Sequence, residues 1–68
     1  MTIIEYLDNV KRVGTLFKIV NGWGTTLYSG TVSTYKNWVH RTDYDNTEIF
    51  MMAFDKNDVL EIQIDTDD

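Results

Sequence analysis

Two apolar runs near the end of the chain constrain its fold more than any other sequence feature. Residues 49–54 read IFMMAF, residues 59–64 read VLEIQI, and the polar turn DKND separates them. From Leu60 to Ile64 every other residue is aliphatic and the residues between are polar, which is the period of a half-buried strand. The first run has no polar position, as in a central strand covered on both faces or a strand in an interface. The two runs therefore predict a β-hairpin with an apolar face that other elements must cover.

The N-terminal residues predict a helix that can cover this face. Thr2 and Glu5 have the spacing of a capping box, in which each side chain bonds the backbone N–H of the other residue. Apolar residues follow at helical intervals, at Ile3, Leu7 and Val10. Two basic residues at positions 11 and 12 and a glycine at position 14 are typical of a helix C-terminus. We expect a helix over residues 3–12 that packs on a sheet.

A second hairpin is predicted in residues 15–32. Two stretches rich in β-branched and aromatic residues lie on either side of the loop sequence NGWG. The Asn21-Gly22 pair is a strong hairpin signal because both residues tolerate positive φ, and Gly24 leaves room for a longer loop or a bulge. Gly30 indicates a bulge or a close backbone approach within the second strand. Trp23, at the tip, either folds back over the sheet or stands exposed for a partner, and both alternatives stay open.

The remaining segments complete the predicted order helix-strand-strand-helix-strand-strand. Ser33 and Thr34 predict the N-cap of a second short helix that ends near Arg41. We therefore expect a single α+β domain over residues 1–68, with a small antiparallel sheet of about four strands and the helices packed on one face. The last residues, 66–68, form an acidic tail that we expect to fray.

Composition narrows the class of protein. The chain has 68 residues and no cysteine, so its core has no disulfide or thiolate–metal site to support it, and a reducing compartment is favoured. The N-terminal stretch carries acidic residues and lacks the basic region of a signal peptide. The longest apolar run is far shorter than the roughly 20 residues that cross a bilayer. These features predict a soluble protein of the bacterial cytoplasm with no membrane association.

Charge is distributed unevenly along the chain. Residues 1–42 hold five basic and two acidic residues, a net charge of +3, whereas residues 43–68 hold one basic and nine acidic residues, a net charge of −8. Such asymmetry either marks an interaction surface or merely keeps an exposed face soluble, and both explanations stay open. The candidate acidic face comprises Asp43, Asp45, Glu48, Asp55, Asp58, Glu61 and Asp65.

Most kinds of site chemistry are not supported by the sequence. His40 is the only histidine, and no base and carboxylate are spaced around Ser29 or Ser33 as nucleophilic catalysis requires. The acidic turns lack the glycine of a calcium loop, so we expect no metal site and no cofactor. A net charge of −5 opposes direct nucleic-acid binding. We therefore predict that the protein is not an enzyme and that it recognises another protein, with Trp23 and Trp38 as candidate aromatic anchors.

Along the chain the sequence follows the pattern T-x-x-E-Y-L, a two-stranded hairpin, V-S, and then E-I…L-E-I-Q-I, with the positions Thr2, Glu5, Tyr6, Leu7, Val32, Ser33, Leu60, Ile62 and Ile64. In this pattern the chain resembles small acidic proteins carried by bacteriophages and integrative elements of Gram-positive bacteria. These are scaffold positions, so the resemblance transfers no functional residue. Most such proteins have no assigned function, and some are anti-CRISPR or anti-restriction inhibitors that occupy nucleic-acid sites with acidic surfaces. The resemblance thus implies an accessory protein that inhibits a host defence protein or another nucleic-acid-handling protein.

Two functional hypotheses follow. In the first, the acidic face docks on a partner protein in place of phosphates, and binding weakens steeply with salt. In the second, the protein is a structural homodimer in which residues 49–54 lie at the interface or pair through an exposed sheet edge, and its acidic charge serves solubility only.

Overall fold

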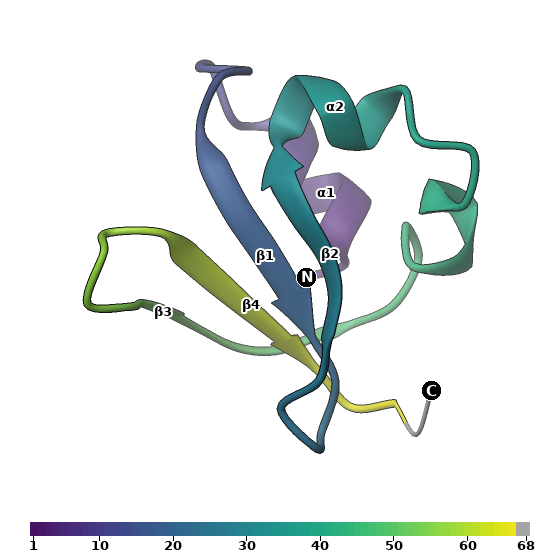
Figure 1. The fold of residues 1–68 in the computed structure, drawn as a ribbon. Coiled ribbons are helices and arrows are strands. Elements are labelled where there is room, and N and C mark those ends of the chain that lie inside the picture. The colour runs from purple at the N-terminus through teal and green to yellow at the C-terminus, as the bar shows by residue number, and fades with distance from the viewer. Residues whose placement is uncertain (67–68) are drawn as a thin grey trace.

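The fold is a four-stranded sheet with two short helices, seen in a computed structural model that describes residues 1–66 (Figure 1). In chain order its elements are α1 (Ile3–Asp8), β1 (Leu16–Val20), β2 (Thr26–Thr31), α2 (Val32–Lys36), the 3₁₀ turn η1 (Arg41–Asp43), β3 (Ile49–Phe54) and β4 (Leu60–Ile64). The predicted α+β class is confirmed, and the order of elements along the chain agrees with the prediction except for the 3₁₀ turn η1 between α2 and β3. Most of the tail for which fraying is predicted, residues 67 and 68, lies outside the described residues.

The sheet is mixed, so the prediction of an antiparallel sheet is wrong. The strand order is β2-β1-β4-β3, with antiparallel pairs β1–β2 and β3–β4 and a parallel pair β1–β4 in the centre. Both hairpins form as the sequence predicts. Alternation within a hairpin does not reveal which of its strands will meet the other hairpin, or in which direction, and this is why the central pairing was not predictable.

The core lies between one face of the sheet and both helices. Phe17 and Ile19 of β1 stand in register with Leu60 and Ile62 of β4, and all four side chains are buried. One buried cluster contains these residues together with side chains from β2, from the end of β4 and from both helices, namely Ile3, Leu7, Tyr28, Val32, Tyr35 and Ile64. Aliphatic and aromatic residues at alternate strand positions therefore supply the apolar face that the helices cover.

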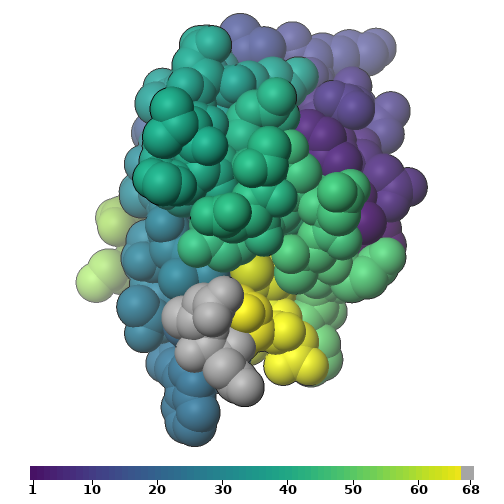
Figure 2. All heavy atoms as spheres, turned by 90° about the vertical axis from the view of Figure 1, so that its right-hand side faces the viewer, coloured from purple at the N-terminus to yellow at the C-terminus, as the bar shows by residue number. Residues whose placement is uncertain are grey.

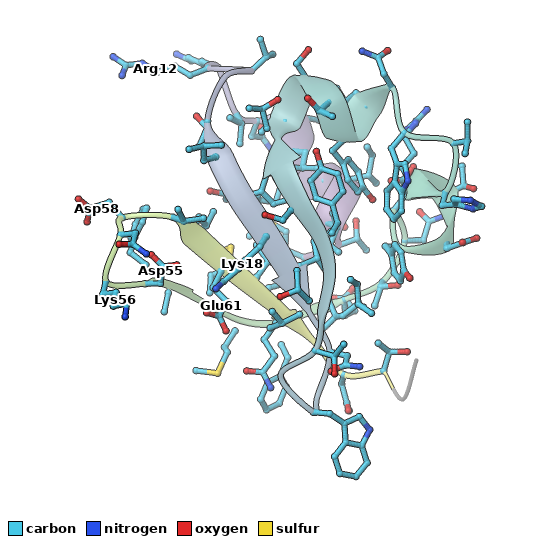
Figure 3. All side chains as sticks on the ribbon, in the orientation of Figure 1. Arg12, Lys18, Asp55, Lys56, Asp58 and Glu61 are labelled. Carbon is cyan, nitrogen blue, oxygen red and sulfur yellow. The ribbon has the colours of Figure 1, made fainter. Side chains whose placement is uncertain are left out.

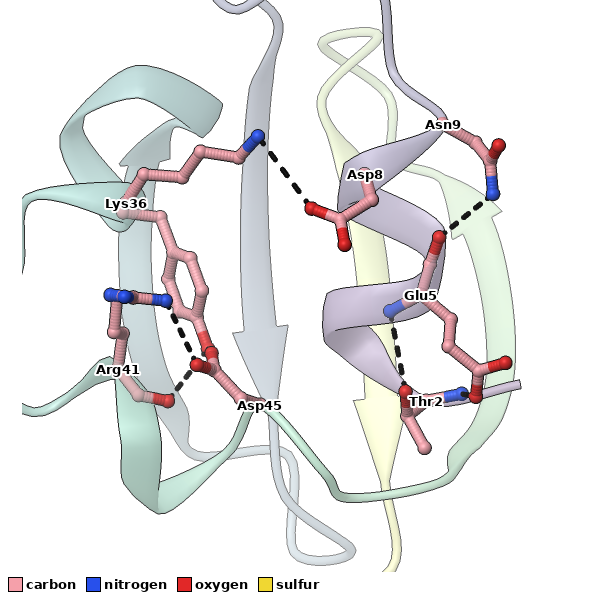
Figure 4. Close-up of polar contacts among 8 residues, drawn as sticks. Thr2, Glu5, Asp8, Asn9, Lys36, Arg41 and Asp45 are labelled. Carbon is pink, nitrogen blue, oxygen red and sulfur yellow. Dashed lines mark hydrogen bonds and ion pairs between the residues drawn. The ribbon is translucent and has the colours of Figure 1, made fainter.

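The first helix begins where predicted but ends four residues earlier. The Thr2 Oγ1 atom accepts a 3.3 Å bond from the Glu5 backbone N–H, and the Thr2 N–H donates to Glu5 Oε1 at 3.1 Å, which confirms the capping box (Figure 4). The bond that the Thr2 backbone N–H donates to the Glu5 carboxylate is the main cause that lowers the pKa of Glu5. The helix ends at Asp8 because Asn9 caps it, with its side-chain N–H₂ group donating to the Glu5 carbonyl at 2.9 Å.

The second helix also differs from its predicted limits. Its N-cap is Thr31, so the prediction of Ser33 or Thr34 as the N-cap is wrong. The Thr31 hydroxyl accepts a 3.1 Å bond from the backbone N–H of Thr34. It ends at Lys36, and the separate turn η1 follows at Arg41–Asp43. None of the helices within residues 1–66 has the length and apolar character needed to cross a membrane.

The helices leave part of the sheet uncovered. Met52 and Phe54 of β3 stand directly opposite the buried residues Ile62 and Leu60 of β4, so their side chains point to the helix side of the sheet. Both remain exposed, Phe54 by 70%. The β3–β4 hairpin projects away from the helices in Figure 1, with its turn at the far left of the view. The prediction that helices cover this face therefore fits only the central part of the sheet.

The loop between β1 and β2 is longer than the two-residue turn that Asn-Gly suggests. The Asn21 side chain is buried, and its Oδ1 atom accepts 2.9 Å bonds from the backbone N–H groups of Trp23 and Thr25. Positive φ occurs at Gly24, where φ is 82°, and not at Asn21 or Gly22. Asn21 thus organises the loop through its side chain, and the register of the pair shifts next to the loop, between Ile19 and Val20.

Candidate binding surface

Asp45, the most buried of the predicted acidic residues, holds two segments of the fold together. Its carboxylate lies 2.7 Å from the Tyr35 hydroxyl and 2.9 Å from Nη1 of Arg41 (Figure 4). Tyr35 is completely buried, and both its burial and its bond to Asp45 raise the pKa of its phenol. Asp45 is only 8% exposed and is bonded on both carboxylate oxygens, so it has a structural role and presents little charge to a partner.

Asp55 and Glu61 share one cation on the face of the sheet opposite the helices. The Lys18 Nζ atom lies 3.5 Å from Asp55 Oδ2 and 3.6 Å from Glu61 Oε2 (Figure 3). The parallel pairing of β1 and β4 places Lys18 directly beside Glu61. Asp55 also accepts backbone N–H bonds from Asn57 at 2.7 Å and from Val59 at 3.0 Å, which close the β3–β4 turn. Two acidic residues are therefore partly neutralised within the chain.

The other four predicted acidic residues lie at separate places. Glu48 precedes β3 and binds the N-terminal amino group of Met1 at 2.7 Å, which raises the pKa of that amino group. Asp43 lies in η1, with its carboxylate 3.9 Å from Nδ1 of His40. Asp58 lies in the β3–β4 turn, and Asp65 follows β4. The structure thus distributes the predicted acidic face over η1, the start of β3, the hairpin turn and β4.

The two predicted aromatic anchors have different environments. Trp38 is half-buried and packs on the rings of Tyr28, Tyr35 and Tyr44, the last stacked at an interplanar angle of 12°. Trp23 is 78% exposed at the tip of the β1–β2 loop, which settles the alternative left open by the sequence. Of the two, Trp23 is the ring that is free to meet a partner.

Four large apolar side chains of β3 are exposed to solvent. Phe54 is exposed by 70%, Phe50 by 67%, Met51 by 52% and Met52 by 37%. β3 lies at the end of the strand order, so this run is not a central strand covered on both faces. From the sequence, these residues had a functional role only in the homodimer hypothesis. The unbroken apolar run IFMMAF was the sequence feature that indicated an interface there.

The outer edge of β3 is partly covered by the N-terminus. The Ile49 N–H donates to the Met1 carbonyl at 2.9 Å, and the Ile3 N–H donates to the Thr47 carbonyl at 3.1 Å. The segment before β3 therefore runs beside the N-terminal residues, in agreement with the adjoining green and purple atoms in Figure 2. Beyond Ile49 no further strand of residues 1–66 pairs with this edge.

The opposite edge of the sheet differs in character. β2 reads TLYSGT, contains polar residues on its exposed positions, and has a register shift where it pairs with β1. Short, polar and irregular edges discourage pairing with other chains. The edge formed by β3 has no charged residue or proline within Ile49–Phe54, although a register shift occurs at its start, between Ile49 and Met51. The apolar edge is thus a property of β3 and not of the sheet as a whole.

A shallow hollow lies where β3, β4 and the β1–β2 loop approach one another. Gly22, Phe50, Gln63 and Asp65 line it, and its volume is about 240 Å³. Pockets for small molecules usually measure roughly 300–1,000 Å³. No group of three or more residues able to bind a metal occurs within residues 1–66.

Comparison of the chain with protein-family models, with curated proteins and with solved structures found no match.

Proposed function

We propose that this chain is a small non-enzymatic protein-binding module and that β3 is its binding element. The observation that carries this proposal is the coincidence of an unpaired backbone edge with four exposed apolar side chains on the same strand. An edge strand of this kind can pair its backbone with an extended segment of another chain while its side chains bury apolar surface.

The chemistry of the surface favours a protein partner over other ligands. A net charge of −5 repels the phosphates of nucleic acids. The hollow beside Phe50 is small for a ligand pocket. Exposed Phe and Met side chains are common in the centres of protein interfaces, and exposed acidic residues such as Asp58 then contribute at the rim, mainly to the rate of association. A role in a phage or integrative element, as an inhibitor acting in the bacterial cytoplasm, rests on the sequence resemblance alone.

A capture experiment with three forms of the protein tests this proposal. The wild type, Phe54→Lys and Val39→Lys are immobilised and exposed to bacterial lysate at low and at high salt. Val39 is 81% exposed and lies outside the strands, so Val39→Lys is a matched control for the added charge. We expect a protein that binds the wild type and Val39→Lys at both salt concentrations and does not bind Phe54→Lys.

Two outcomes would contradict the proposal. Binding that survives in Phe54→Lys would place the binding element elsewhere. Binding that is lost at high salt but is insensitive to Phe54→Lys would favour docking through the exposed acidic residues.

A further inference from the structure

Resting on the proposed role of β3 in protein binding, we propose that the hollow beside β3 binds an arginine side chain of the partner protein. The hollow is lined by Gly22, Phe50, Gln63 and Asp65. The guanidinium group lies flat on the Phe50 ring and donates hydrogen bonds to the Asp65 carboxylate. The exposed ring, the oxygen atoms around the hollow, the local charge and the volume each support this arrangement.

A β-bulge brings Phe50 to the hollow. Ile49 of β3 stands opposite Ile64 of β4. Two residues further along β3, Met51 stands opposite Gln63, which is only one residue along β4 from Ile64. Phe50 is therefore the extra residue of a bulge, which breaks the alternation of the strand and redirects side chains. The Phe50 ring is 67% exposed and lines the hollow together with Gln63, so it is open to a ligand and does not join the core.

Oxygen atoms lie around the rest of the hollow. Asp65 is exposed, and a Cβ atom added at Gly22 would lie 4.0 Å from its Oδ1 atom. The same added atom would lie 3.8 Å from the backbone carbonyl oxygen of Thr66. Gln63 contributes a side-chain amide, whose oxygen accepts hydrogen bonds. These oxygen atoms are acceptors, so the ligand that fits them carries several N–H donors.

The charge at the hollow selects a cation. Among the described residues that line it, none is basic. Asp65 makes no ion pair within residues 1–66. Lys18, on the same face of the sheet, is already held by Asp55 and Glu61. A cationic ligand therefore gains the attraction of an uncompensated carboxylate, whereas an anion is repelled.

A ring beside a carboxylate favours arginine among the cationic side chains. A guanidinium group is planar, so it stacks on an aromatic ring while its edge donates parallel hydrogen bonds to a carboxylate. A lysine ammonium group is a compact and strongly hydrated charge, which uses the ring less well. The volume of about 240 Å³ is below that of small-molecule pockets and suits one side chain. Because Phe50 belongs to β3, a segment docked on this strand has the hollow within reach.

A titration of the full chain with a blocked tripeptide, acetyl-Gly-Arg-Gly-amide, tests this proposal. The peptide is added up to about 100 mM at constant ionic strength and followed by NMR. We expect the backbone amide of Gly22 and the side-chain amide of Gln63 to shift along one saturating curve. The dissociation constant should be about 1–50 mM, because a single side chain makes few contacts. The arginine δ protons should shift upfield, because they lie over the Phe50 ring.

Two pairs of variants locate the site. Asp65→Asn removes the charge at nearly constant size and should weaken binding about fivefold. Its control, Asp58→Asn, removes the same charge from the hairpin turn at a positive φ that asparagine tolerates, and should change binding less than about twofold.

Phe50→Leu should weaken binding about two- to fivefold and remove the upfield shift of the arginine protons. Phe54→Leu makes the same change at a ring of similar exposure on β3 that does not line the hollow, and it should leave both quantities unchanged.

Two control peptides test the chemistry of the ligand. Citrulline in place of arginine keeps the shape but removes the charge, and this peptide should not saturate. The lysine peptide should bind about threefold more weakly than the arginine peptide. Shifts that do not saturate, or equal binding of either control peptide, would overturn the arginine site. Unchanged binding in Asp65→Asn or in Phe50→Leu would overturn it as well.

The outcomes also separate this inference from the proposed function. Capture of a protein by the wild type but not by Phe54→Lys, without saturable binding of the arginine peptide, overturns the arginine site and leaves β3 as a binding element. Saturable arginine binding together with capture that is insensitive to Phe54→Lys overturns the role of β3 and leaves the hollow as an arginine site. The absence of both results overturns both.

Discussion

The Tyr35 hydroxyl donates a 2.7 Å hydrogen bond to Asp45 Oδ1, and this contact joins α2 to the segment that leads into β3. The same hydroxyl lies 2.9 Å from the Arg41 carbonyl oxygen, and the Arg41 side chain completes the group by bonding the other carboxylate oxygen. The backbone of Asp45 also accepts the Ile4 N–H at 2.9 Å. One buried acidic residue therefore connects α1, α2 and the approach to β3.

Removing this hydroxyl should destabilise the protein. Tyr35→Phe removes one of the two side-chain donors to a buried carboxylate, and we expect the free energy of unfolding to fall by about 1–3 kcal/mol. Tyr44→Phe is a matched control, because the Tyr44 ring is half-buried and its hydroxyl makes no hydrogen bond within residues 1–66. Chemical denaturation of the three proteins measures the difference. Equal losses in both variants would contradict a structural role for the Tyr35–Asp45 bond.

The β3–β4 turn should weaken in acid through Asp55. Backbone N–H bonds from Val59 and Asn57, and then Lys18, lower the pKa of Asp55 in the folded state. Its contribution to stability is therefore complete above the unfolded value of about 3.9 and is lost as pH falls through the lower folded value. Asp55→Asn should reduce stability at pH 7 and flatten the acid limb of the stability profile below about pH 4.

A control for this pH dependence is Asp43→Asn, which removes the same charge from an exposed carboxylate that accepts no backbone N–H bond within residues 1–66. Thermal unfolding between pH 2 and pH 7 gives both profiles. The prediction fails if Asp55→Asn keeps the acid dependence of the wild type.

Gly30 should not tolerate a side chain. A Cβ atom at this position would lie 2.6 Å from the Tyr28 hydroxyl oxygen and 3.1 Å from Cζ of the same ring. Tyr28 is held in place because its hydroxyl donates to the Thr31 carbonyl at 2.8 Å and its ring packs on Phe17. We expect Gly30→Ala to cost about 1–3 kcal/mol through displacement of this ring.

The corresponding control is Gly14→Ala, where an added Cβ meets nothing within 4 Å. This change should leave stability equal or raise it by up to about 1 kcal/mol, since alanine restricts the unfolded chain. Thermal melts of both variants test the pair of predictions. A Gly30→Ala protein as stable as Gly14→Ala would show that Tyr28 moves without cost.

Asp58 should accept glycine but not a β-branched residue. It is the one non-glycine residue with positive φ in residues 1–66, at 61°, a conformation that favours Gly, Asn and Asp. Asp58→Gly should be neutral or stabilising by up to about 1 kcal/mol, whereas Asp58→Val should cost about 1–2 kcal/mol. Lys56→Val, in the same turn at negative φ, separates backbone strain from loss of a charged side chain. Similar losses for both valine variants would argue against strain at Asp58.

Local sequence determined the elements of this protein. The Thr2–Glu5 capping box, the alternation from Leu60 to Ile64 and the polar turns each depend on residues a few positions apart, so α1 and both hairpins could be predicted. Helix limits were less predictable, because side-chain bonds of Asn9 and Thr31 fix the end of α1 and the start of α2. Among the site residues, the sequence could identify Trp23 as a loop residue but not that its ring would be exposed.

Tertiary structure alone decided how the hairpins meet and what remains exposed. The parallel pairing of β1 with β4 gives Lys18 the partners Asp55 and Glu61 and leaves IFMMAF at an edge. The packing of α2 against the segment before β3 buries Asp45 beside Tyr35. The sequence by itself determined that β3 would be an apolar strand, because composition and period act locally. Whether that strand would be covered or free depended on which strand took the centre of the sheet, and that choice is set by contacts between residues far apart in the chain.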